Sequence, residues 1–96
     1  MKLFWSNRAR ADLLAIFRYI ADDDPVAATA WVKKLRLRAA AAARSPGIGR
    51  WLPERLDRRD LREVIFKGYR IVYTVAQGKL IVLTVFEGHR RLPADL

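Results

Sequence analysis

The chain of 96 residues contains no cysteine and only one histidine, His89. Without cysteine the protein forms no disulfide and has no thiolate nucleophile or thiolate metal ligand. One histidine is too few for a zinc site, and no serine motif accompanies it from which a nucleophilic triad could be built. The Gly-rich nucleotide-binding signatures are also absent. We therefore expect no metal and no cofactor.

The sequence also lacks a long apolar run. No stretch approaches the length that spans a membrane, and Met1–Trp5 does not open a hydrophobic signal region. The lack of cysteine is compatible with a reducing compartment, so we expect a cytoplasmic protein. A hydrophobic content of 52% with 10% aromatic residues excludes a disordered chain and predicts one domain over residues 1–96.

Acidic residues are scarce after the first third of the chain. Basic and acidic side chains balance in residues 1–31, so residues 32–96 carry the whole formal net charge of +9. An excess of this size in a small domain favours a polyanionic partner, either a nucleic acid or an acidic protein. The alternative is a solvated basic surface that serves only solubility.

Three segments rich in β-branched and aromatic residues follow one another near the C-terminal end. They are residues 61–66, 69–76 and 79–86. Lys67-Gly68 and Gln77-Gly78 separate them, and glycine supplies the positive φ that a two-residue hairpin loop needs. The sequence therefore predicts a three-stranded antiparallel meander.

Two-residue loops also assign the faces of this meander, because opposed residues share a face. Arg70 then pairs with Ile65 on one side and with Val85 on the other. One face is apolar and forms the core: Val64, Phe66, Tyr69, Ile71, Tyr73, Val75, Leu80, Val82 and Phe86. The other is half apolar: Glu63, Ile65, Arg70, Val72, Thr74, Ile81, Leu83, Val85 and Glu87. On this second face Arg70 requires water, a bound anion, or an ion pair with Glu63 or Glu87.

Two helices precede the meander. Apolar side chains recur at the spacing of one helical face at Leu13, Ile16, Phe17 and Ile20. They predict a helix over residues 7–21 with Ser6 as its N-cap. A second helix is expected over residues 25–44, with Asp24 as N-cap and Pro25 at the first helical position. We prefer this capping role to a metal site, because consecutive carboxylates point in different directions.

The remaining segments are short or irregular. Lys2–Trp5 is expected to form a short strand, and residues 45–60 a loop. A loop of this length in a small domain is often functional. Four arginines gather at its end and just beyond it: Arg55, Arg58, Arg59 and Arg62.

The polar residues suit acid–base chemistry on a phosphate ester. Cleavage of RNA through its 2′-hydroxyl needs a base, an acid and cations that stabilise the phosphorane, but no metal. His89 is the natural acid or base, with Glu54 or Glu63 as its partner. The cations available to hold a phosphate are Arg62, Lys67, Arg70, Arg90 and Arg91. In the structural alternative, Arg70 forms an ion pair and His89 is an ordinary exposed histidine.

Taken in order, these features resemble the RelE/ParE superfamily of type II toxin–antitoxin toxins. The matching segments are Trp5-Ser6, Asp12-Leu13, Tyr19-Ile20, Ser45-Pro46, Gly49-Arg50, Leu52-Pro53-Glu54, Leu61–Val64, Tyr69–Tyr73 and Gly88–Pro93. The resemblance implies an α+β fold, with two helices packed on one face of a small antiparallel β-sheet. That sheet would consist of the short N-terminal strand and the meander, with its other face exposed and basic.

The resemblance also implies a cognate antitoxin that wraps around the toxin and neutralises it. The half-apolar face suits a partner segment that folds on binding. The antitoxin-binding residues expected on this basis are Ile65, Val72, Ile81, Leu83 and Val85.

Members of this superfamily differ in their target. RelE-like and YoeB-like members cleave mRNA on the ribosome, whereas ParE-like members poison DNA gyrase. By resemblance, Arg70 and Arg90 match arginines of the ribonucleases, and His89 and Glu54 match the catalytic pair of YoeB-like members. The C-terminal tyrosine of that chemistry is missing, and the RelE-like lysine pair is reduced to Lys67.

Asp12-Leu13, the long second helix and His89-Arg90-Arg91 are closer to the ParE-like pattern. We therefore expect a plasmid-stabilisation type of growth inhibitor that acts on DNA gyrase. One alternative is a metal-independent, ribosome-dependent mRNA endoribonuclease. The other is a non-toxic basic module that binds nucleic acid.

Overall fold

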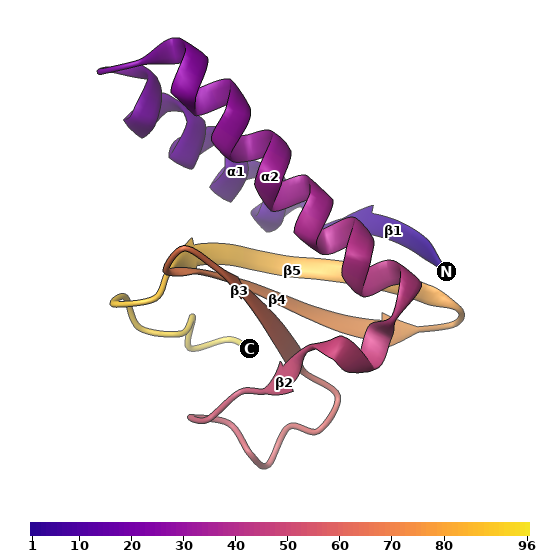
Figure 1. Cartoon of the computed structure of the whole chain (residues 1–96). Coiled ribbons are helices and arrows are strands. Elements are labelled where there is room, and N and C mark those ends of the chain that lie inside the picture. The colour runs from indigo at the N-terminus through magenta and orange to yellow at the C-terminus, as the bar shows by residue number, and fades with distance from the viewer.

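The computed structural model describes all 96 residues as two helices lying side by side on one face of a five-stranded sheet (Figure 1). The elements in chain order are β1 (Lys2–Trp5), α1 (Asn7–Ala21), α2 (Pro25–Arg44), the 3-10 helix η1 (Pro46–Ile48), β2 (Arg50–Trp51), β3 (Arg62–Phe66), β4 (Tyr69–Ala76) and β5 (Lys79–Glu87). The predicted α+β class is confirmed. None of the helices combines the length and the hydrophobicity that a membrane-spanning helix requires.

The sheet is mixed rather than wholly antiparallel. Its strand order is β1-β5-β4-β3-β2, and β3, β4 and β5 form the predicted antiparallel meander. β1 pairs in parallel with β5, from Lys2 opposite Lys79 to Trp5 opposite Val82. The segment predicted as a loop contributes the two-residue edge strand β2, which pairs with the start of β3.

Both helices begin at the predicted caps. The Ser6 side chain accepts a hydrogen bond from the Ala9 amide, and Asp24 accepts one from the Ala27 amide, each at 3.0 Å. These bonds satisfy amide groups that have no partner inside the helix. The bounds of both helices agree with the predicted ranges because the caps are local in sequence.

A β-bulge at Leu83 changes the predicted faces of β5. Both hairpin loops have two residues, and Arg70 faces Ile65 as predicted. The register then shifts between Val72 and Tyr73, so Arg70 faces Phe86 and not Val85. The extra residue exchanges the faces beyond it. Val85 consequently enters the main core, and Phe86 moves to the second face of the sheet.

The main core lies between the helices and the sheet. Its buried members are Ala9, Leu13, Ile16, Leu35, Ala39, Ala42, Ala43, Phe66, Ile71, Tyr73, Leu80, Val82 and Val85. Several of them are alanines of α2, and such small side chains let that helix approach the sheet closely. Val75 was assigned to this core, but it is 44% exposed near the end of β4.

The second face of the sheet is partly covered, which corrects the expectation of an exposed face. Leu52, Leu61 and Val72 form a small buried cluster there. The side chains that pack against this cluster are Leu83, Phe86, Leu92 and Leu96. The segment after β2 and the C-terminal residues run along the side of the sheet opposite the helices (Figure 1). They bury Val72 completely.

Candidate functional site

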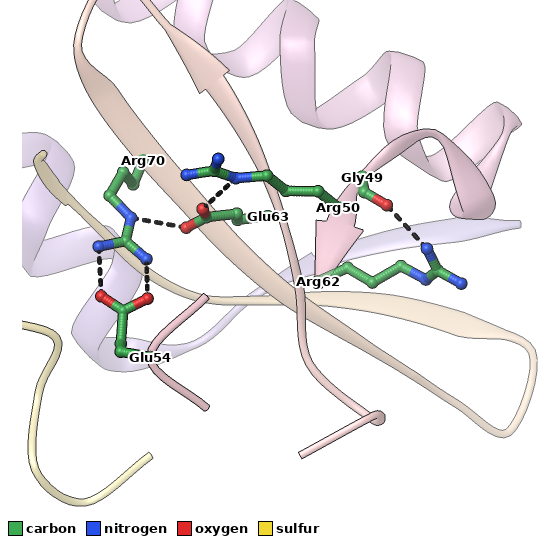
Figure 2. A network of polar contacts seen from close by, with 6 residues as sticks. All are labelled: Gly49, Arg50, Glu54, Arg62, Glu63 and Arg70. Carbon is green, nitrogen blue, oxygen red and sulfur yellow. Dashed lines mark hydrogen bonds and ion pairs between the residues drawn. The ribbon is translucent and has the colours of Figure 1, made fainter. Parts of the chain in front are cut away.

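Arg70 lies at the centre of a chain of ion pairs on the sheet face away from the helices (Figure 2). Its Nε donates to Glu63 Oε1 at 2.6 Å. Its Nη1 and Nη2 donate to the two carboxylate oxygens of Glu54, each at 2.7 Å. The second oxygen of Glu63 accepts from Arg50 Nε, also at 2.7 Å. All three nitrogens of the Arg70 guanidinium are therefore bound to carboxylates.

This network is neutral as a whole, and its inner pair, Glu63 and Arg70, is buried, whereas the Glu54 and Arg50 side chains at its two ends are 40% and 55% exposed. The Glu63 side chain is fully buried, and the Arg70 side chain is 9% exposed. The hydrogen bonds from Arg70 lower the pKa of Glu54 to about 2. The same bond to Glu54, with that to Glu63, holds the pKa of Arg70 above its ordinary value. Both groups stay ionised at neutral pH, and loss of one partner would leave an uncompensated buried charge.

The sheet register positions the inner part of the network. Arg50 stands directly opposite Glu63 on neighbouring strands. Glu63 stands opposite Val72, two residues beyond Arg70, so Glu63 and Arg70 are diagonal neighbours on one face. Arg70 therefore forms the ion pair with Glu63 that was the structural alternative to binding an anion. Glu54 completes the network from the segment after β2.

Gly49 fixes where β2 begins. Its amide donates to Tyr73 Oη at 3.0 Å, and that hydroxyl donates to Pro46 O at 2.6 Å. A Cβ atom at residue 49 would collide with the Tyr73 ring and lie 2.9 Å from Glu63 O. Glycine is therefore required for this close approach, which holds β2 beside β3.

His89 is not part of the Arg70 network. Its side chain is 95% exposed, and Nδ1 contacts the carboxylate of Glu87, two residues earlier. Its amide donates to the same carboxylate at 3.2 Å. His89 makes no hydrogen bond with Arg70 or Glu54. The structure thus joins Arg70 to Glu54 as an ion pair, and leaves the predicted acid or base outside it.

The cations predicted to hold a phosphate do not form one patch. Arg62 and Glu63 are consecutive in β3, so their side chains leave opposite faces of the sheet. Figure 2 shows Arg62 extending away from the Arg70 network toward Gly49 O, to which it donates at 2.8 Å. Lys67 lies 5.4 Å from the ring centre of Trp31 on α2.

Arg90 is located elsewhere, at a groove of about 560 Å³ between α1 and the end of β5. Tyr19, Tyr69 and Glu87 also line this groove, and burial raises the pKa of Tyr69. Arg91 is exposed and forms no ion pair. The groove thus contains the basic Arg90 and the acidic Glu87 beside the phenol groups of Tyr19 and Tyr69. It is separate from the Arg70 network.

Asp12 was noted in the sequence only through the family resemblance, and the structure gives it a role. Its Oδ2 accepts from Thr84 Oγ1 at 2.6 Å and from the Val85 amide at 2.9 Å. This part of β5 lies beyond its pairing with β1. Asp12 thus satisfies an edge amide and ties α1 to β5. No local pattern could have indicated it, since the partners are more than 70 residues away.

The residues expected to bind an antitoxin differ in how far they are exposed to solvent. Ile65 is 44% exposed, and Ile81 and Leu83 are half-buried. Val72 is fully buried within the small cluster, and Val85 is 2% exposed in the main core because of the bulge. The expectation that all five share one accessible surface is therefore wrong for Val72 and Val85.

Comparison with known proteins identifies the family. A family model described as the ParE toxin of the type II toxin–antitoxin system, parDE, matches residues 3–92. A search of curated proteins finds no match. One solved structure, the chromosomal ParDE TA system from P. aeruginosa, aligns with a TM-score of 0.75 and 20% identity over 91% of this chain and 95% of that chain. Because the sequence identity is only 20%, the similarity to this solved structure concerns the fold alone. Because the family model covers nearly the whole sequence, the chain belongs to the ParE toxin family of type II toxin–antitoxin systems.

Proposed function

We propose that this ParE-family toxin inhibits growth by binding DNA gyrase, and that a cognate antitoxin holds it inactive. The observation that carries the proposal is the state of Arg70, whose guanidinium is fully bound by Glu54 and Glu63. This is the arginine that a ribonuclease of the wider superfamily would use on its substrate. Here it is a structural cation.

The chemistry of RNA cleavage sets a requirement that these residues do not meet together. A scissile phosphate needs a free cation within reach of both an acid and a base. To bind Arg70, a phosphate would have to displace the Glu54 carboxylate from two hydrogen bonds of 2.7 Å. His89 is bound to Glu87 on another segment. Inhibition by binding needs no such assembly, and it therefore fits this chain better.

The charge of the protein supports a target that contains nucleic acid. Only five of the nineteen Lys and Arg side chains form ion pairs with a carboxylate: Arg8, Arg50, Arg55, Arg58 and Arg70. The others give the surface a strong positive potential, which accelerates association with polyanions. Gyrase that is engaged with DNA offers such a surface.

The antitoxin is proposed to be an acidic protein that covers exposed apolar side chains of the toxin. Ile65 on β3, together with the half-buried Ile81 and Leu83 on β5, would be shielded from water by such a segment. A negatively charged partner would also offset the excess positive charge. The antitoxin should therefore bind with an affinity that falls as salt increases.

A supercoiling assay tests the proposal. Purified toxin is added in increasing amounts to gyrase and relaxed plasmid, and inhibition should appear at toxin concentrations similar to that of gyrase. Prior addition of the cognate antitoxin should restore supercoiling. A matched assay with programmed ribosomes should show intact mRNA. Unchanged supercoiling at a large excess of toxin, with cleaved mRNA, would overturn the proposal in favour of the ribonuclease.

A further inference from the structure

Two guanidinium groups lie against one indole ring at the edge of the sheet. Trp51 is in the edge strand β2, and its side chain is 40% exposed. The Cζ atom of Arg59 lies 4.1 Å from its ring centre, and that of Arg62 lies 5.0 Å away. We call Trp51, Arg59 and Arg62 the Trp51 stack. Trp51 and Arg62 are cross-strand partners, so the stack occupies the face opposite the Arg70 network.

The stack is not neutralised by carboxylates. Arg59 Nε donates to Leu56 O at 3.1 Å, and Arg62 Nη1 donates to Gly49 O at 2.8 Å. Backbone carbonyls orient these guanidinium groups but do not cancel their charge. Each arginine keeps nitrogen donors that no protein group accepts from. Arg59 is exposed and Arg62 is half-buried, so the free donors of Arg59 are the more accessible ones.

The segment from β2 to the start of β3 contains two further arginines, and their partners differ from those of Arg59 and Arg62. Arg55 donates two hydrogen bonds to Asp57, and Arg58 donates two to Asp60. The four arginines of this segment therefore fall into two classes. Two are paired with a carboxylate two residues later. The other two are unpaired, and both lie on the ring of Trp51.

Two like charges on one ring repel each other, and the indole face only partly offsets this repulsion. An anion bound to the free donors of either guanidinium group reduces it. Forked guanidinium donors match the oxygens of a phosphate, and their fixed orientation reduces the entropy lost on binding. The flat faces of guanidinium and indole groups also stack on unpaired bases. A ligand that combines phosphates with accessible base faces would use both properties.

We propose that the Trp51 stack binds single-stranded nucleic acid, with phosphates at Arg59 and Arg62 and an unpaired base on the planar groups. The bases of a duplex are stacked on one another, so they cannot reach this surface. The inference concerns a surface apart from the Arg70 network, and it holds whether or not gyrase is the target. It is tested with the purified protein and oligonucleotides alone.

The first experiment compares Arg59→Gln with Arg58→Gln. The two substitutions are at adjacent positions and lower the net charge by the same amount. The general electrostatic attraction between the protein and the oligonucleotide therefore falls equally in both variants. Binding of a fluorescent oligothymidylate of about twelve nucleotides, a common footprint for such surfaces, is followed by anisotropy at several salt concentrations. Arg59→Gln should weaken binding about tenfold and reduce the salt slope by about 0.7. Arg58→Gln should weaken it by less than about twofold. Equal effects of the two variants would overturn the proposal.

The second experiment tests stacking through Trp51. Trp51→Ala should weaken binding about tenfold, whereas Trp51→Phe keeps a ring and should retain most of the affinity. Thermal melts establish that both variants are folded, and Trp51→Phe keeps the comparison informative if the alanine variant is not. Unchanged binding by a folded Trp51→Ala variant would contradict the proposal.

Two competitors test the class of ligand. A duplex of the same length should compete about tenfold less well than the single strand, because its base faces are hidden. A polyglutamate peptide of matched charge should compete more weakly still, since it has no base to stack. Equal competition by the duplex would reduce the surface to a general phosphate contact. Equal competition by the peptide would make it a site for acidic proteins. Either result would overturn the proposal.

Discussion

Glu54 and Arg70 form a two-pronged ion pair, in which both nitrogen–oxygen distances are 2.7 Å. The two residues are 16 positions apart in the sequence. The pair fastens the segment after β2 to the middle strand of the sheet. The Glu54 carboxylate also occupies the two terminal guanidinium nitrogens of Arg70, which were expected to bind a phosphate. Arg70, which its position in the strand made a candidate catalytic residue, is therefore a structural cation in this chain.

Replacement of Arg70 should destabilise the fold. Arg70→Ala leaves the buried carboxylate of Glu63 with Arg50 alone and frees Glu54. Breaking a buried pair in this way costs about 3–5 kcal/mol. The free energy of unfolding from urea titration measures the change. Arg91→Ala removes an exposed arginine without an ion pair and should alter stability by less than about 0.5 kcal/mol. Equal stability of the two variants would contradict the structural role of Arg70.

Glu54 should make stability depend on pH in the acidic range. Its pKa is lowered from 4.5 to about 2 by Arg70, so its ionised form favours the folded state. This contribution is fully present above pH 4.5 and disappears as pH falls through 2. Glu54→Gln should therefore be less stable than the wild type at pH 7, and the difference should vanish near pH 2. Urea titrations at several pH values measure it. A difference that is independent of pH would contradict the assignment.

Gly49 and Gly47 provide a matched pair of substitutions. A Cβ atom at residue 49 collides with Tyr73, whereas one at residue 47 has no atom within 4 Å. Gly49→Ala should lower the unfolding free energy by about 1–3 kcal/mol, because a well-packed contact must move. Gly47→Ala should have little effect. Thermal melts of the two variants give the comparison, and similar melting temperatures would contradict the packing of Gly49 on Tyr73.

Asp12 should protect one amide of β5. Asp12→Ala removes the acceptor of the Val85 amide and the Thr84 hydroxyl, which costs about 1–3 kcal/mol. The exchange rate of the Val85 amide, measured by NMR, should increase. Asp23→Ala, at an exposed position between the helices, serves as the control. An unchanged exchange rate in Asp12→Ala would show that another group protects this amide.

The sequence predicted those features whose causes are local. Ser6 and Asp24 cap the helices within a few residues, so the bounds of α1 and α2 followed from the pattern. Gly68 and Gly78 set the two hairpins. The bulge at Leu83 has no such local signal in the sequence, and it places Val85 in the main core. The face of each residue beyond the bulge therefore could not be derived from loop length alone.

The candidate site shows the same limit. An ion pair of Arg70 with Glu63 was one of the alternatives that the sequence left open, beside Glu87, water or a bound anion, and strand pairing brings Glu63 and Arg70 together. Glu54 was expected as a catalytic base, but the path of the segment after β2 makes it the second partner of Arg70. That path depends on Gly49 and on the small cluster around Leu52, which are tertiary features. The separation of His89 from this network likewise follows from the path of the chain after β5.

The most direct test is the activity of His89→Ala beside the wild type, in growth, supercoiling and ribosomal mRNA cleavage assays. His89 is exposed and outside the Arg70 network, so the variant should fold normally. We predict that both proteins arrest growth and inhibit gyrase equally, with mRNA left intact. Loss of toxicity in His89→Ala, with mRNA cut by the wild type and gyrase unaffected, would contradict the account.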